Sequence, residues 1–232
     1  MKNKVCLVTG VGPGTGRALV ERFASDYQVA MLARDEQRLA TVEKVVENTH
    51  AFPCDVTDQA QLAGVLDAVS TRLGAPTVVI HNAVGGARGD FLSIEPEVLQ
   101  RNFDVNVMAF LHLARAVAPA MIEQGEGAIL ATGNTAAYRG VARFAGFAPT
   151  KAAQRVLAES MARHLGPQGV HVAYVAIDAV IDLPWTRRLW PDEPDGFFCK
   201  PADIAGECWH LAHQPPSAWT FDVKIRPYGE KW

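Results

Sequence analysis

Four glycines fall within seven residues where the first apolar run of the chain ends, in the sequence Thr9-Gly10-Val11-Gly12-Pro13-Gly14-Thr15-Gly16. An apolar pattern of helical period follows at once, with Ala18, Leu19 and Phe23. Glycines in such a turn let the backbone approach a pyrophosphate, and the N-terminus of the following helix favours negative charge. Tight strand-to-helix turns also need glycine, so the cluster alone is weak. Its position between a first strand and a helix indicates a dinucleotide-binding turn.

Short apolar runs and segments of helical period alternate along the rest of the chain. The apolar runs predict strands at residues 5–9, 28–33, 50–55, 77–81, 128–132, 171–177 and 222–226. Several are apolar almost throughout, which is typical of parallel strands covered on both faces. Between them, helical faces are predicted at Leu62, Val65, Leu66 and Val69, at Leu99, Phe103, Val107, Phe110 and Leu111, and at Val156, Leu157, Met161 and Leu165. The alternation predicts an α/β fold over residues 1–232, a single Rossmann-like domain with a doubly wound, parallel, seven-stranded sheet and helices on both faces.

One segment departs from both periods. Residues 183–201 are rich in proline and aromatic residues and predict a loop or substrate lid. Trp185, Trp190, Phe197 and Phe198 would wall an apolar pocket or pack on a neighbouring subunit.

Composition restricts the remaining classes of protein. The 232 residues are 49% hydrophobic and 20% charged, with 22 basic and 25 acidic side chains and no run of like charge. We therefore expect neither a nucleic-acid partner nor a membrane partner. The four cysteines are far apart, with no CxxC pair, which favours reduced thiols in a cytoplasmic protein and no metal site.

The end of the second predicted strand bears on the choice of cofactor. A cofactor with a free ribose 2′-hydroxyl needs a carboxylate near this point, whereas a 2′-phosphate needs arginine. Ala33 offers no carboxylate, while Arg34 offers a guanidinium suited to phosphate. Asp35 and Glu36 follow and complicate the choice, and Arg34 could instead cap a surface turn. We expect NADP(H) in preference to NAD(H).

These motifs and their order resemble the short-chain dehydrogenase/reductase family over nearly the whole chain. The Thr9–Gly16 turn has the form TGxxxGxG, Asp55-Val56 follows the third strand, Asn82-Ala83 resembles part of the NNAG segment, and Asn106 and Lys151 resemble members of the catalytic tetrad. The resemblance implies cofactor binding by Gly10, Gly12, Gly14, Thr15, Gly16, Arg34, Asp55, Val56, Asn82, Ala83 and Lys151. It also implies a small-molecule substrate and a homodimer or homotetramer.

Two departures from the family pattern concern proton transfer. Phe147 stands four residues before Lys151, where the family has tyrosine, and Asn134 stands thirteen residues earlier, where the family has serine. A phenyl ring cannot transfer a proton, a contribution worth about 10²–10⁴-fold in rate. The Asn134 amide can still donate a hydrogen bond. Lys151 can still hold the nicotinamide ribose, and Asn106 can still support an ordered water.

Three functions remain open from the sequence. One is an NADPH-dependent reductase whose acceptor, an iminium ion or activated alkene, needs little acid catalysis. Another is a carbonyl reductase with a displaced acid, for which Tyr138 or a water held by Lys151 would serve. The third is an NADP-binding pseudoenzyme, a sensor or assembly partner without turnover. The candidate catalytic residues are Asn106, Asn134, Tyr138 and Lys151. Each also has a structural interpretation: a buried helix amide, a loop cap, a surface aromatic and a solvated lysine.

Overall fold

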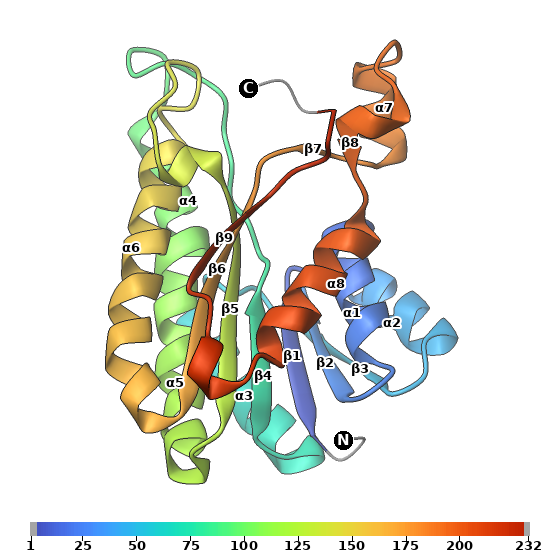
Figure 1. Cartoon of the computed structure of the whole chain (residues 1–232), viewed down its shortest axis with the longest axis vertical. Coiled ribbons are helices and arrows are strands. Elements are labelled where there is room, and N and C mark those ends of the chain that lie inside the picture. The colour runs from blue at the N-terminus through green and yellow to red at the C-terminus, as the bar shows by residue number, and fades with distance from the viewer. Residues whose placement is uncertain (1–3, 230–232) are drawn as a thin grey trace.

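A single parallel sheet organises the part of the chain that the computed structural model describes, residues 4–229 (Figure 1). Its seven strands lie in the order β3-β2-β1-β4-β5-β6-β9. Their bounds are Val5–Thr9 (β1), Gln28–Ala33 (β2), Thr49–Pro53 (β3), Pro76–His81 (β4), Gly127–Asn134 (β5), Val170–Ile177 (β6) and Asp222–Ile225 (β9). Every pairing is parallel. The predicted fold class is confirmed, and each predicted strand is present to within two residues at either end.

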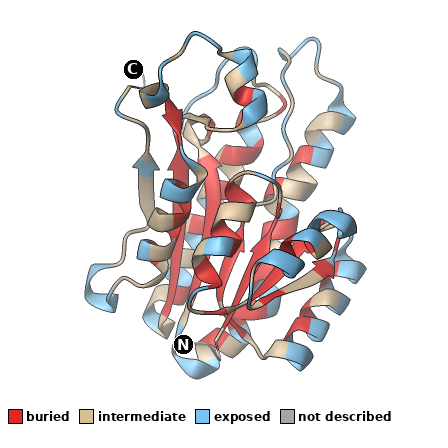
Figure 2. Cartoon of the chain, turned by 90° about the vertical axis from the view of Figure 1, so that its right-hand side faces the viewer, coloured by how far each residue is buried: buried red, intermediate tan, exposed pale blue. Residues whose placement is uncertain are grey.

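Two layers of helices cover the sheet. The helices are α1 (Thr15–Phe23), α2 (Glu36–Val45), α3 (Gln59–Leu73), α4 (Pro96–Phe103), α5 (Ala109–Gln124), α6 (Ala148–Leu165), α7 (Pro184–Leu189) and α8 (Pro201–Ala212). One buried cluster joins one face of the sheet to α3, α5 and α6, and a second joins the other face to α1, α2 and α8. Figure 2 shows the buried residues running along the central strands. The apolar strands thus have both faces covered, as parallel pairing requires.

The order of the strands reverses between β1 and β4. Strands β2 and β3 follow β1 outward in one direction, whereas β4, β5, β6 and β9 extend in the other. Loops leaving β1 and β4 therefore diverge and leave a crevice at the carboxyl ends of the strands, where open α/β sheets bind ligands.

The segment 183–201 is more ordered than its sequence predicts. Helix α7 begins with Pro184, and the Thr186 hydroxyl accepts a hydrogen bond from the Leu183 backbone N–H at 3.0 Å. Strand β8 (Phe198–Cys199) pairs with β7 (Val180–Ile181). The predicted loop thus contains a six-residue helix and a two-residue strand, which are too short for periodicity to register, and its role as a substrate lid stays a prediction.

One residue of the predicted buried helical faces is exposed, and one long helical stretch is strongly apolar. Val156, placed by periodicity on the buried face of α6, is 61% exposed. The continuous helical stretch Pro96–Gln124 is long and apolar enough to cross a membrane by length and composition. Its apolar residues Phe110, Leu113 and Val117 are buried in the cluster beneath α5, as in the core helix of a globular fold.

Candidate active site

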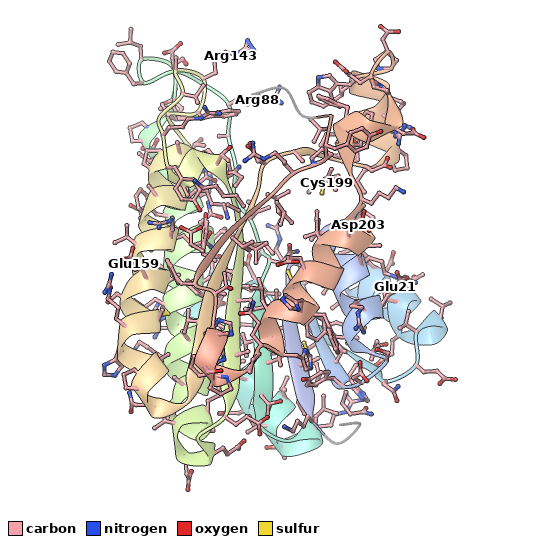
Figure 3. The ribbon with its side chains drawn as sticks, viewed as in Figure 1. Glu21, Arg88, Arg143, Glu159, Cys199 and Asp203 are labelled. Atoms are coloured by element: carbon pink, nitrogen blue, oxygen red, sulfur yellow. The ribbon has the colours of Figure 1, made fainter. Side chains whose placement is uncertain are left out.

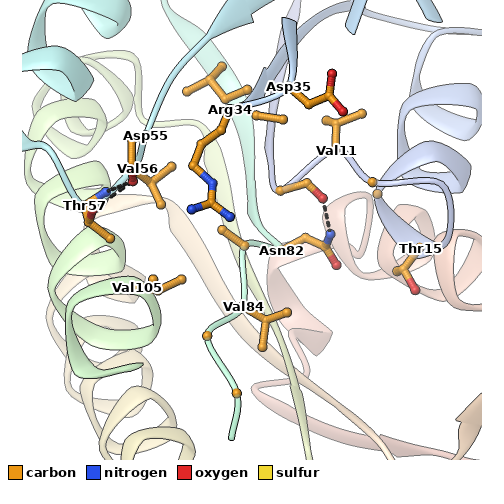
Figure 4. Close-up of a pocket in the computed structure, with 18 of the residues that line it drawn as sticks. Val11, Thr15, Arg34, Asp35, Asp55, Val56, Thr57, Asn82, Val84 and Val105 are labelled. Carbon is orange, nitrogen blue, oxygen red and sulfur yellow. Dashed lines mark hydrogen bonds between the residues drawn. The ribbon is translucent and has the colours of Figure 1, made fainter. Parts of the chain in front are cut away.

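A cleft of about 980 Å³ opens at the point where the strand order reverses (Figure 4). Its walls come from the glycine-rich turn after β1, the ends of β2 and β3, the segment after β4, the start of the α4–α5 stretch, and Ile181 and Leu183. Of the residues predicted to bind a cofactor, all but Lys151 line it: Gly10, Gly12, Gly14, Thr15, Gly16, Arg34, Asp55, Val56, Asn82 and Ala83.

The glycines of the turn differ in what they do. A Cβ on Gly10 would lie 2.5 Å from Ala83, and one on Gly16 would lie 2.4 Å from the Gly10 carbonyl, so the protein's own backbone requires both. Gly12 lines the cleft and has nothing within 4 Å of such a Cβ. The hydroxyl of Thr15 is buried in the first turn of α1 without a partner in the described chain. Free space above Gly12 and an orphaned hydroxyl beside unpaired helix N–H groups fit a phosphate group.

Arg34 and Asp35 have separate tasks at the end of β2. Asp35 caps α2 by accepting the Arg38 backbone N–H at 2.9 Å, and it also pairs with the Arg38 guanidinium at 2.9 Å. No hydrogen bond or ion pair occupies the Arg34 guanidinium in the described chain, and Figure 4 shows it pointing into the cleft between Val56 and Asn82. Asp35, one of the two acids that complicate the choice of cofactor, is therefore already bonded within the protein, whereas the Arg34 guanidinium faces the cleft.

Asp55 is held on the opposite side of the cleft. Its Oδ1 accepts the backbone N–H and the hydroxyl of Thr57 at 3.0 and 2.8 Å. Burial opposes ionisation, but these hydrogen bonds and the charge of Arg34 outweigh it and lower the carboxyl pKa. Asp55 is thus a carboxylate with a lowered pKa at the wall of the cleft.

Asn82 ties three strand ends together. Its amide donates to the Gly10 carbonyl at 2.9 Å and accepts from the Thr132 hydroxyl at 3.0 Å. The Thr9 hydroxyl accepts the backbone N–H groups of Asn82 and Ala83 at 3.2 and 3.3 Å. Asn82 thereby fixes the glycine-rich turn against the floor of the cleft.

Asn106 occupies a π-helical turn, Asp104–Met108, between α4 and α5. The side chain is fully buried; it accepts the Gly85 N–H at 3.0 Å and donates to the Gly85 carbonyl and the Thr150 hydroxyl, both at 2.8 Å. Wider helical turns of this kind often occur at functional sites because they redirect a carbonyl. Here the redirected Asn106 carbonyl accepts the Gln154 amide at 2.7 Å.

Lys151 lies behind the cleft and is 2% exposed. Its Nζ donates to the Thr132 carbonyl at 3.2 Å and to Gln154 Oε1 at 2.9 Å. Burial lowers its pKa to about 7, and no carboxylate opposes that effect. Nearby His81 is also buried, which lowers its pKa to about 3 and leaves it neutral. Lys151 is thus a buried amine whose acceptors are both neutral oxygens.

Phe147 and Asn134 take the places where the family has its hydroxyls. Phe147 is the N-cap residue of α6; its ring centroid is 5.9 Å from Lys151 Nζ, and the ring packs over Gly86 at the cleft wall. Asn134 ends β5, and its Oδ1 accepts the Ala136 N–H at 3.0 Å. That bond is the loop cap expected in the structural interpretation, and it leaves the Asn134 NH₂ group available as a donor.

Tyr138 points away from the cleft. Its hydroxyl donates to Asp222 at the start of β9, and the Arg155 guanidinium lies 5.0 Å from the ring centroid. Burial, with the hydrogen bond to Asp222, raises the pKa of its hydroxyl. Like Asn134 and Lys151, Tyr138 is not among the residues that line the cleft, and its hydroxyl is already bonded to Asp222.

The rim of the site is both apolar and basic. Gly89 in the loop after β4 bridges to Phe144 in the loop before α6, with the Gly89 N–H donating to the Arg143 carbonyl at 2.9 Å. Figure 3 shows Arg88 and Arg143 at this end of the molecule. The exposed apolar side chains of these two loops and of α7 are Phe91, Leu92, Val141, Trp185 and Leu189. In the described residues no group of His, Cys, Asp and Glu is placed to hold a metal ion.

Gln154 is the residue that sequence reasoning missed. The available signal was a polar side chain three residues after Lys151, on the same side of the predicted helix, because buried polar side chains need partners. The partner on the other side, Asn106, lies 48 residues away in sequence and appears only in the fold.

Comparison with known proteins is consistent with this geometry. A family model described as short chain dehydrogenase matches residues 4–191. The chain is 30% identical over 239 residues to a 3alpha-hydroxysteroid dehydrogenase of Mediterraneibacter gnavus, covering 96% of this chain and 95% of that protein. A metagenomic short-chain oxidoreductase solved in complex with NADP has a TM-score of 0.85 at 27% identity, covering 99% of both chains. An apo short-chain oxidoreductase of Pseudomonas aeruginosa PAO1, described as containing an atypical catalytic center, has a TM-score of 0.89 at 22% identity, covering 100% of this chain and 98% of that one, and bears on the fold alone.

Proposed function

Because this chain belongs to the short-chain dehydrogenase family, we propose that it is an oxidoreductase that uses NADP(H) in preference to NAD(H) and reduces acceptors needing no proton from the protein. The observation that carries the cofactor preference is the pair Arg34 and Asp35. The arginine is free at the cleft, and the carboxylate is used by α2 and Arg38. A guanidinium that faces the cleft, beside an aspartate already bonded within the protein, favours a 2′-phosphate.

The residues of the cleft fit a dinucleotide. The pyrophosphate would bind over Gly12 and Gly14 with the Thr15 hydroxyl and the first N–H groups of α1, the 2′-phosphate at Arg34, and the adenine near Asp55 and Val56. Asn82 and Ala83 would support the nicotinamide half. Lys151 would reach the nicotinamide ribose only by exchanging one of its two present acceptors. When bound, the reduced nicotinamide supplies a hydride.

The class of hydride acceptor follows from the side chains at the nicotinamide end of the cleft. Phe147 carries no transferable proton, Lys151 is enclosed, and Tyr138 is bound to Asp222. Asn134 retains donor hydrogens that can orient an acceptor atom. An iminium carbon takes up a hydride while its C=N π pair becomes the nitrogen lone pair, so the product amine needs no added proton. An activated alkene yields an enolate, which water protonates. Ketones, which need a proton on a developing alkoxide, are expected to be poor substrates.

A matched pair of glycine variants tests how the turn holds the cofactor. Gly12→Ala is expected to leave the free energy of unfolding unchanged, because the new methyl group meets no protein atom, but to weaken NADPH binding. Gly16→Ala is expected to lower the free energy of unfolding by about 1–3 kcal/mol through overlap with the Gly10 carbonyl. Urea titration measures the first property and fluorescence titration the second. A Gly12 variant that binds NADPH as tightly as the wild type would contradict the proposed phosphate site.

Turnover separates the reductase from the alternative, an NADP-binding protein that acts as a sensor or assembly partner. The burial of Lys151 and the hydrogen bond from Tyr138 to Asp222 favour that alternative, because neither side chain is free to give a proton to an acceptor in the cleft. Consumption of NADPH is expected with cyclic iminium ions or enones and not with matched ketones. No consumption with any acceptor, despite tight NADPH binding, would support the pseudoenzyme.

The Tyr138 hydroxyl provides a further check on the proton source. Tyr138→Phe is expected to leave the turnover rate within about twofold of the wild type, since the hydroxyl is bonded to Asp222 outside the cleft. Loss of turnover with unchanged NADPH affinity would instead identify Tyr138 as a displaced acid.

We also propose a cytoplasmic location and assembly into a homodimer or homotetramer. The four cysteines are all free and buried, which supports a reducing, cytoplasmic compartment. Met108 and Val156, both exposed on the α5–α6 side, support a homodimer or homotetramer through these helices. Light scattering that shows a monomer would contradict the assembly.

A further inference from the structure

Phe147, Lys151 and Gln154 lie on one side of α6, because spacings of four and three residues bring side chains into line on a helix. Lys151 stands in the middle of this stripe. On one side is the Phe147 ring, 5.9 Å from Nζ to the ring centroid, and on the other is the Gln154 amide, 2.9 Å from Nζ. Neither neighbour carries a proton that it can exchange near neutral pH.

The Gln154 amide spans the gap between two structural elements. Its Oε1 accepts from Lys151, and its Nε2 donates at 2.7 Å to the carbonyl of Asn106 in the π-helical turn. The side chain is fully buried. A water in this position would accept a proton from Lys151 and pass it on, whereas a carboxamide holds the same two partners without transferring anything. Asn106 is expected from the sequence to support an ordered water, and in the structure its carbonyl accepts from the protein's own Gln154.

We propose that Gln154 is a positioning residue that fills the junction between Lys151 and the Asn106 carbonyl, so that water cannot enter behind Lys151 and no proton path leads through it to the substrate. This inference rests on the proposed function and deepens it. With Phe147 closing the substrate side and Gln154 closing the far side, the site is restricted to acceptors that are already cationic or that take their proton from solvent in the open cleft.

Competitive labelling of lysine amines tests the junction without cofactor or turnover. The full-length protein is treated with a trace of acetic anhydride over a range of pH, and each lysine is followed by peptide mass spectrometry. Exposed Lys44 on α2 is the internal reference. In the wild type, Lys151 is expected to react at least about 100-fold more slowly than Lys44, because reaction requires local opening of the packed helix.

Three variants distinguish the effect of filling the space between Lys151 and the Asn106 carbonyl from the effect of loosening α6. Gln154→Ala leaves a polar cavity, so labelling of Lys151 is expected to rise at least about tenfold, and its labelling midpoint is expected to move to higher pH as water solvates the ammonium. Gln154→Met fills the same space and is expected to preserve the protection. Ala158→Gly, one turn further along α6 and fully buried, loosens the helix by about 1 kcal/mol without opening the junction, and Lys151 is expected to stay protected.

Two labelling results would contradict the proposed role of Gln154. If Lys151 stays protected in Gln154→Ala, another group seals the path and the proposal is wrong. If Ala158→Gly raises labelling as much as Gln154→Ala, labelling reports loosening of α6, which also contradicts the proposal. Failure of the protein to bind NADPH would overturn the proposed function but would leave these labelling rates interpretable.

Discussion

Arg34→Gln is expected to weaken NADPH binding by about 10- to 100-fold while leaving NADH affinity unchanged. Hydrogen bonds to a charged partner contribute about 1.5–3 kcal/mol each, and the variant keeps a polar side chain but loses the positive charge. In the described chain no hydrogen bond or ion pair holds the guanidinium, and its electrostatic effect is on the pKa of Asp55, so its loss removes no hydrogen bond of the protein itself. Fluorescence titration with both cofactors measures the two affinities.

Arg115→Gln is the matched control for this prediction. Arg115 is exposed on α5 and does not line the cleft, so the same change of charge should alter neither affinity. An equal loss of NADPH affinity in both variants would show a general effect of net charge. Equal weakening of NADPH and NADH by Arg34→Gln would contradict a 2′-phosphate site at Arg34.

Replacing Lys151 by methionine is expected to flatten the pH dependence of stability above neutrality. Burial lowers the folded-state pKa of Lys151 to about 7 from the ordinary lysine value of 10.5. Between these two values the unfolded chain binds a proton that the folded protein does not, so the free energy of unfolding rises with pH by about 1.4 kcal/mol per unit. Below pH 7 both states bind the proton, and the full destabilisation by this group is present.

Denaturant titrations of wild type and Lys151→Met between about pH 7 and 9 test this dependence. The wild type should gain roughly 2 kcal/mol over the variant across the two units, because Lys151 of the folded protein is half titrated at pH 7. His81 adds no slope in this range because its folded pKa of about 3 and its unfolded value both lie below it. Parallel curves for the two proteins would mean that Lys151 is charged in the folded state, and the account of an enclosed neutral amine would fail.

Local features of the sequence predicted the fold and most of the residues that line the cleft. The strands are nearly continuous apolar runs, and their ends coincide with Thr9, Ala33 and His81, where the polar residues of the cleft begin. The glycine-rich turn is specified by residues adjacent in sequence. These elements depend on backbone geometry and period, which a single sequence displays.

The surroundings of the groups that could transfer a proton depend on contacts between residues far apart in sequence. Gln154 meets Asn106 across 48 positions, and Tyr138 meets Asp222 across 84, so neither partnership leaves a local pattern. The role of Asp35 was ambiguous for the opposite reason, since a carboxylate beside Arg34 is compatible both with ribose binding and with capping α2. Only the packed structure decides between such roles, because it shows which hydrogen bonds are already made.

Titration of the wild-type protein with NADPH and, in parallel, with NADH tests the central claim most directly. The cleft, the free Arg34 and the orphaned Thr15 hydroxyl predict saturable binding of NADPH, with NADH at least about tenfold weaker. Binding of neither cofactor, in a folded protein, would contradict the oxidoreductase and the NADP sensor together.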